Sequence, residues 1–269
     1  KAAPFFRVGN YIIKKLRPSR PGFRILLFHD VPASSFHAFE EFVSYVSETY
    51  GVLSPNQASA WLDGYKVKAI DSANWPYPCL FTFDDGFVSN FNLAKTILNR
   101  HDLKCLFFIN PGLIDLSKEK QGEAIAKNIF DGDLKREELH SELRLMAWTE
   151  LLELKNDGHQ VGCHGMFHRR LSELSGSSLH QEIVLGGDLL DERLSQKTDW
   201  YAYAFGDISS INRTALSIIS GRYSYCRSGL RGINNKNTQK LALKADAIDL
   251  ETSHCYQKFL SEGGADYKY

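Results

Sequence analysis

Two adjacent carboxylates, Asp84 and Asp85, end a short apolar run in the stretch "LFTFDDGF" (80–87). Side by side, two carboxylates repel each other and resist burial unless a positive group lies beside them. Two histidines four residues apart, His164 and His168 in "HGMFH", can direct both imidazoles at one point from a single turn of chain. With one carboxylate they predict a metal site that leaves coordination positions for water and substrate.

Open sites of this kind are typical of catalytic rather than structural metals. Imidazole and carboxylate ligands favour Zn2+, and Co2+, Ni2+, Mn2+ and Fe2+ also accept this ligand set. Each residue has an ordinary explanation as well, because a strand-end aspartate often caps the next helix and strand-end polar residues are common. The metal site is therefore inferred from the combination of residues and not from any one of them.

The elements that must position these residues alternate between short apolar runs and longer segments with helical periodicity. The apolar runs predict strands at 23–31, 79–83, 103–110, 159–164, 200–206 and 223–228, with a seventh at 242–250. The longer segments predict helices at 38–50, 92–101, 148–158, 178–195 and 211–220. This alternation predicts an α/β fold with a parallel sheet, either open or closed into a barrel.

Several of the predicted strands end in a polar or reactive group. His29 follows the first strand, Asp84 and Asp85 follow the second, His164 ends the fourth, and Phe205 lies near the end of the fifth. In parallel α/β folds, functional groups gather at the carboxyl ends of the strands. We therefore expect these residues to meet in one site.

Length and charge limit the class of protein. The chain of 269 residues, with 32 basic and 32 acidic side chains, has a globular composition and suits one large α/β domain. Its net charge of zero provides no basic field, so nucleic acid is not the expected partner.

We expect a domain over 23–269, with a polar helical insertion around 115–145, after a basic, amphipathic extension over 1–22. That extension fits a packing helix better than a membrane-surface contact.

The five cysteines are scattered and form no CxxC pair, which favours buried free thiols. Free thiols favour a reducing, cytoplasmic location over export. The sequence begins at Lys1 rather than at a methionine, so the compartment stays open. No pattern indicates an oligomeric state.

Three motifs together resemble a known family. "FTFDDGF", then "HGMFHRRLSEL", then "YAYAFGD" are similar to the motifs of the polysaccharide deacetylase family (NodB homology, carbohydrate esterase 4), and the resemblance extends over roughly 25 to 250. The approach "MAWTELLELKNDGHQVGCH" also resembles the family's path to its second motif. The resemblance implies a deformed (β/α)7 barrel of parallel strands with outer helices. It also implies a metal-dependent hydrolase that removes the N-acetyl group of an N-acetylated sugar or polysaccharide.

The resemblance assigns roles to the matching positions. Asp84 would be the general base, and Asp85 would bind the metal with His164 and His168. The backbone N–H of Phe205 would donate to the tetrahedral oxyanion.

A protonated histidine must also deliver a proton to the departing amine. Many family members supply it from a late L-x-H motif, which the surroundings of His254 do not match. Another branch supplies it from a first strand that ends in Y/F-H-x-V. Because "LLFHDV" fits that branch, His29 is the expected general acid, with a purely structural histidine as the alternative.

Three positions depart from the family pattern. Ala204 and Arg169 stand where prolines are common, and the arginine that orients the catalytic aspartate has no clear counterpart, with Lys244 as the nearest candidate. These departures keep open a metal- or glycan-binding pseudoenzyme. A hydrolase of a small non-sugar amide is a further alternative, because such relatives share the metal site.

Overall fold

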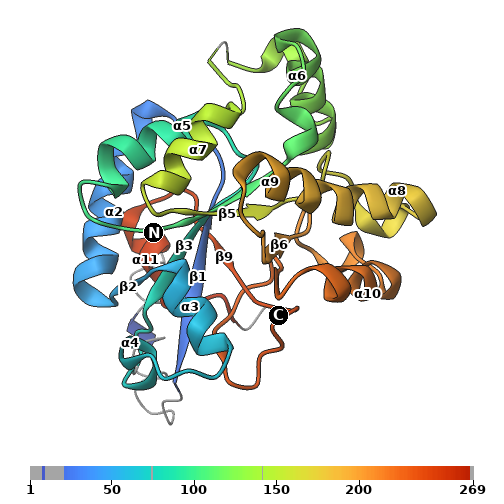
Figure 1. Cartoon of the computed structure of the whole chain (residues 1–269). Helices are drawn as coiled ribbons and strands as arrows, with labels where there is room; N and C mark the ends of the chain where they lie inside the picture. The colour runs from blue at the N-terminus through green and yellow to red at the C-terminus, as the bar shows by residue number, and fades with distance from the viewer. Residues whose placement is uncertain (1–7, 10–20, 74, 141, 267–269) are drawn as a thin grey trace.

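The computed structural model describes residues 8–9, 21–73, 75–140 and 142–266. Within these ranges, a nine-stranded and mostly parallel sheet curls on itself, and helices cover its outer side (Figure 1). The strands are β1 Gly22–Phe28, β2 Val52–Leu53, β3 Cys79–Phe83, β4 Leu106–Ile109, β5 Gln160–Cys163, β6 Trp200–Ala202, β7 Tyr225–Arg227, β8 Asn234–Asn235 and β9 Asp246–Ala247. The predicted extension over 1–22 lies almost wholly outside the described residues, so its packing and membrane contact stay untested.

The helices mostly follow the strands that they connect. They are α2 Phe36–Thr49, α3 Pro55–Leu62, α4 Lys68–Asp71, α5 Val88–Leu93, α6 Lys118–Ala124, α7 Trp148–Asn156, α8 Gly176–His180, α9 Gly186–Leu194, α10 Arg213–Arg222 and α11 His254–Ser261. A π-helical turn, Gln181–Leu185, joins α8 to α9. In the described part of the chain, no helix combines the length and apolar character needed to cross a membrane.

The strand order β7-β6-β5-β4-β3-β1-β8 places six of the predicted strands side by side, with β8, which the sequence did not predict, next to β1. β1 pairs in parallel with β3 on one edge and with β9 on the other. The segment 243–248 then joins the two edges of the sheet, because Leu243 bridges Arg227 of β7 and the N–H of Ile248 donates to Leu27 of β1. The expected parallel strands with outer helices, arranged as a deformed barrel, are thus confirmed.

β1 is apolar along its whole length because both faces of the sheet are covered. Its alternate side chains enter two different cores. Leu26 and Phe28 pack in the layer shared with α2, whereas Ile25 and Leu27 pack in the cluster that the strands enclose. The carboxyl end of β1 is therefore held by buried side chains on both faces of the sheet.

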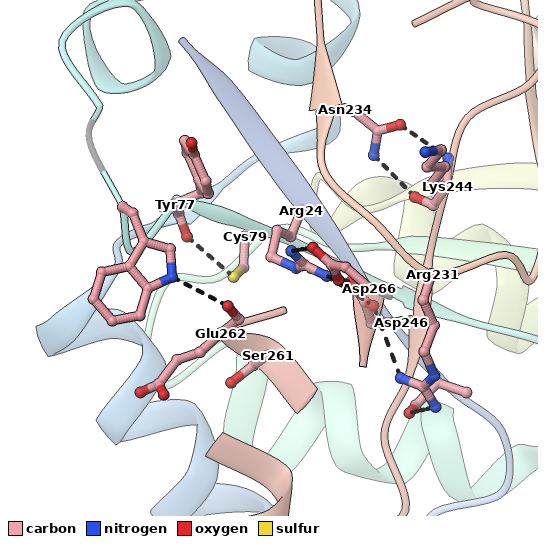
Figure 2. A network of polar contacts seen from close by, with 12 residues as sticks. Arg24, Tyr77, Cys79, Arg231, Asn234, Lys244, Asp246, Ser261, Glu262 and Asp266 are labelled. Atoms are coloured by element: carbon pink, nitrogen blue, oxygen red, sulfur yellow. Dashed lines mark hydrogen bonds and ion pairs between the residues drawn. The ribbon is translucent and has the colours of Figure 1, made fainter. Parts of the chain in front are cut away.

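A buried polar network lies beside the amino-terminal half of β1 (Figure 2). Arg24, near the start of β1, donates from Nε and Nη2 to both carboxylate oxygens of Asp246 in β9, at 2.9 Å each. It also donates to Asp266 near the end of the described chain. Arg24 and Asp246 are fully buried, so the pair fixes β9 and the C-terminal segment against β1.

The polar stretch 115–145 contains α6 and covers the edge of the loop face. Its apolar side chains form a small separate cluster in which Ile125 and Leu145 pack with Phe87 and Leu113. This packing brings Asn128 and Ile129 to the mouth of the barrel. The helical character of the insertion agrees with the sequence, while its standing within one domain stays a prediction.

Candidate metal centre

The structure brings Asp85, His164 and His168 together at the carboxyl ends of β3 and β5. The Nε2 atom of His164 lies 3.5 Å from Asp85 Oδ1, and the Nε2 atom of His168 lies 3.4 Å from the same oxygen. One ligand atom from each residue lies within 4.8 Å of the others, and all three side chains are buried. Three converging donor atoms of these types can hold one divalent cation.

Backbone carbonyls orient both imidazoles toward Asp85. His164 Nδ1 lies 2.7 Å from the carbonyl oxygen of Ala202, and His168 Nδ1 lies 2.8 Å from that of Asn128. Because a carbonyl oxygen only accepts, each Nδ1 carries the proton and donates it. Each Nε2 is left with a lone pair that faces Asp85, as in histidines that ligate metals through Nε2.

Burial favours the neutral form of each of these three side chains. It lowers the pKa of His164 to about 3 and also lowers the pKa of His168, so both imidazoles are neutral at neutral pH. Burial raises the pKa of Asp85 to about 7, and its neighbour Asp84 adds to that rise. Asp85 Oδ1 is buried and accepts no hydrogen bond from the described residues. A divalent cation would satisfy this oxygen, so the residues fit such an ion.

Three of the predicted site residues have left-handed backbone conformations. The φ angles are +70° at Asp85, +59° at His168 and +65° at Phe205. Such conformations are costly for residues other than glycine and gather at functional sites. Gly86 continues the turn after Asp85 with φ +77°, and a Cβ there would lie 2.9 Å from Ile109. This turn lets both aspartates face one site despite the alternation of a strand.

Asp84 has a different partner from Asp85. Arg227, at the end of β7, places Nη2 2.6 Å from Oδ1 and 2.5 Å from Oδ2 of Asp84, and both side chains are buried. Burial by itself raises the pKa of the Asp84 carboxyl, but the charge and hydrogen bonds of Arg227 are the largest opposing influence, and this pKa lies below its ordinary value. Asp84 is therefore an ionised carboxylate beside the predicted metal ligands.

The expectation that Lys244 orients Asp84 is wrong. The Lys244 main chain is hydrogen-bonded to the side chain of Asn234 (Figure 2), and Asn234 pairs with Phe23 at the amino-terminal end of β1. Arg227 holds Asp84 instead. The available signal was its place at the end of the predicted strand 223–228, since the carboxyl ends of parallel strands meet at one edge.

All six predicted site residues line one cavity of about 190 Å3 at the mouth of the barrel. The lining residues are Leu27, His29, Asp84, Asp85, Ile129, His164, His168, Tyr203, Phe205, Gly206, Arg227, Gly229 and Ala247. His29 follows β1 directly and is solvent-exposed. His254 is not part of this lining and instead lies 3.4 Å from Glu41. The cavity thus combines a charged carboxylate, three candidate metal ligands and an exposed imidazole.

Comparisons with known proteins agree with this arrangement. A family model described as polysaccharide deacetylase matches residues 76–220, which is more than half of the chain. No curated protein matches the sequence.

Several solved structures share the fold. A deacetylase from Streptococcus pyogenes, PplD, solved in complex with acetate, is 21% identical with a TM-score of 0.67, over 90% of this chain and 99% of that one. IcaB from Ammonifex degensii is 19% identical with a TM-score of 0.66, over 93% and 99%. A de-N-acetylase from Aggregatibacter actinomycetemcomitans is 15% identical with a TM-score of 0.64, over 88% and 99%. The family model and the shared fold together show that this chain belongs to the polysaccharide deacetylase family.

Proposed function

We propose that this chain is a metal-dependent hydrolase that removes the N-acetyl group from an N-acetylated sugar or polysaccharide. The observation that carries the proposal is that the adjacent carboxylates Asp84 and Asp85 have different partners. Asp84 is ionised against Arg227, while Asp85 joins two neutral imidazoles in a buried ligand set. Metal-dependent amide hydrolysis uses both a base for the attacking water and a Lewis acid for the carbonyl.

Asp85, His164 and His168 would hold the metal, with Zn2+ favoured by the donor types. When bound, a divalent cation polarises a carbonyl and lowers the pKa of water. Asp84 would accept the proton of the attacking water, because Arg227 keeps this carboxylate ionised and fixes its orientation.

Two further groups at the rim would complete the reaction. The backbone N–H of Phe205, held in its left-handed turn, would donate to the oxygen that gains charge. His29, exposed on the wall of the same cavity, would donate a proton to the departing amine nitrogen. Because His29 is exposed, its imidazole can regain the proton from water.

The relatives support an acetylated substrate. The Streptococcus pyogenes structure contains acetate, which is the acid that N-deacetylation releases. The buried Arg227–Asp84 pair also weakens the case for a pseudoenzyme, which rested partly on the lack of an arginine in this position.

Acetate release separates the candidate functions. Zn2+-loaded protein should release acetate from N-acetylglucosamine oligomers and leave a small ureide intact, and Asp84→Asn should abolish the release. Hydrolysis of the ureide alone would favour the small-amide alternative. Metal binding without hydrolysis of either substrate would favour the pseudoenzyme.

A further inference from the structure

Glu182 lies fully buried beneath the loop that carries His168. Its Oε1 atom accepts hydrogen bonds from the backbone N–H of Phe167 at 2.9 Å and of Arg169 at 3.0 Å. These two amides lie on either side of His168 in the chain. The backbone oxygen of Glu182 also accepts from the N–H of Met166 at 2.9 Å. One residue of the π-helical turn therefore holds the loop both before and after the predicted metal ligand.

The second carboxylate oxygen of Glu182 has a charged partner. Arg169 Nε lies 3.1 Å from Glu182 Oε2, and Arg169 Nη2 donates to Gln181 Oε1 at 3.3 Å. A buried carboxylate is tolerated when it is paired and its oxygens accept hydrogen bonds. Arg169 supplies both a backbone and a side-chain donor, whereas proline at this position would supply neither.

His168 needs such support because its φ of +59° is unfavourable for a histidine. Backbone in this region persists only where the surroundings determine it. The Glu182 carboxylate lies close to the backbone of this loop, because a Cβ added at Gly165 would lie 2.6 Å from Glu182 Oε1. Glu182 thus occupies the space directly under the loop.

We propose that Glu182, paired with Arg169, is a positioning residue that fixes His168 and thereby sets the affinity of the centre for its metal. This inference rests on the proposed function. Glu182 itself does not line the cavity. Glu182 acts through its hydrogen bonds to the two backbone amides that flank His168. Its expected effect is therefore on metal binding and not on the chemical step.

Two substitutions and their combination test the inference. Glu182→Gln can keep Oε1 for the two amides but places an amide NH2 against Arg169 Nε. Arg169→Met removes the guanidinium and retains the backbone N–H. We expect Glu182→Gln to weaken Zn2+ binding by about 10- to 100-fold, the usual range for residues that support metal ligands. The double variant, Glu182→Gln with Arg169→Met, should bind Zn2+ more tightly than Glu182→Gln alone, because the Gln NH2 no longer faces the Arg169 Nε–H donor.

Two controls separate positioning from general destabilisation. Glu192→Gln makes the same change on the exposed side of α9. Tyr223→Phe removes the hydroxyl that donates to the carbonyl of Ile183, next to Glu182, and leaves the loop contacts in place. Both controls should bind Zn2+ like the wild type, although Tyr223→Phe should unfold at a lower temperature.

Zn2+ affinity would be measured on metal-free protein by competition with a chromogenic chelator, and acetate release at saturating Zn2+ would follow. Recovery of turnover in Glu182→Gln at saturating Zn2+ would support an effect through metal affinity. Unchanged affinity in Glu182→Gln, or an equal loss in Tyr223→Phe, would overturn the inference while leaving the proposed function intact. A wild type that binds no divalent cation would overturn both.

Discussion

Asp84 and Asp85 are adjacent in the chain and lie in opposite electrostatic environments. Burial raises the pKa of Asp85 to about 7, whereas the influence of burial on Asp84 is opposed chiefly by Arg227 and the pKa of Asp84 is lowered. Pairs of acids whose pKa values are pushed apart are typical of sites that divide two roles between them. The left-handed turn at Asp85 and Gly86 makes this division possible within two consecutive residues.

Replacing Arg227 by lysine should change the pH dependence of the reaction. Lysine keeps the charge but not the rigid, planar guanidinium that places Nη2 against both oxygens of Asp84, so the pKa of Asp84 should rise toward its ordinary value. The acid limb of the kcat/KM profile should then move to higher pH. Turnover at neutral pH should fall as well, because the carboxylate is oriented less rigidly. Arg222→Lys, at a surface ion pair with Asp188 and Asp191, is the matched control. An acid limb that does not move would show that Arg227 does not tune the base.

Removal of His29 should separate chemistry from metal binding. His29→Ala should retain the metal, since this side chain is not among the three converging ligands. Turnover should fall by about 10²–10⁴-fold, as for the loss of a general acid. His254→Ala, on α11 beside Glu41, should leave turnover unchanged. Normal turnover in His29→Ala would transfer the acid role to another group.

Removal of His164 should eliminate the metal while preserving the fold. His164→Ala deletes one of three ligands, and the cores on both sides of the sheet remain intact. Elemental analysis should then find little bound metal, and circular dichroism should match the wild type. His180→Ala, on the exposed side of α8, should keep full metal content. Stoichiometric metal in His164→Ala would contradict the ligand assignment.

Asp85→Asn should stabilise the metal-free protein at alkaline pH. The folded-state pKa of Asp85 is raised to about 7, above its unfolded value. The free energy of unfolding therefore falls as the pH rises from the unfolded-state pKa to about 7, and the loss is complete above the folded-state pKa. In a chelator at pH 8, Asp85→Asn should unfold at a higher temperature than the wild type. Near pH 5 the folded carboxyl is protonated, so the gain should shrink. An equal gain at both pH values would contradict the raised pKa.

Much of the fold was predictable because its strands carry strong local signals. The continuous apolar run at 79–83 predicted β3 with the bounds that the structure has, Cys79–Phe83. The two-residue strands β2 and β8 gave no such signal, because their extended conformation depends on pairing with β3 and β1. Local patterns therefore predict the long buried elements, and tertiary contacts determine the short ones.

The candidate site shows the same limit. The two aspartates and two histidines were visible as motifs, but Arg227 reaches Asp84 across 143 positions of sequence. The contact from Asn128 to His168 is made by a backbone carbonyl, which any residue type supplies. Groups that act by their backbone, or by pairing across the barrel, leave little trace in a single sequence.

The most direct test of the central claim is acetate release measured against added metal, with the wild type and Asp84→Asn in parallel. Chelated wild type should release no acetate from N-acetylglucosamine oligomers, and activity should return as Zn2+ approaches one equivalent. Asp84→Asn should bind the same equivalent of Zn2+ and release no more acetate than the chelated wild type. Full activity in the chelated wild type, or in Asp84→Asn, would contradict a metal-dependent reaction with Asp84 as its base.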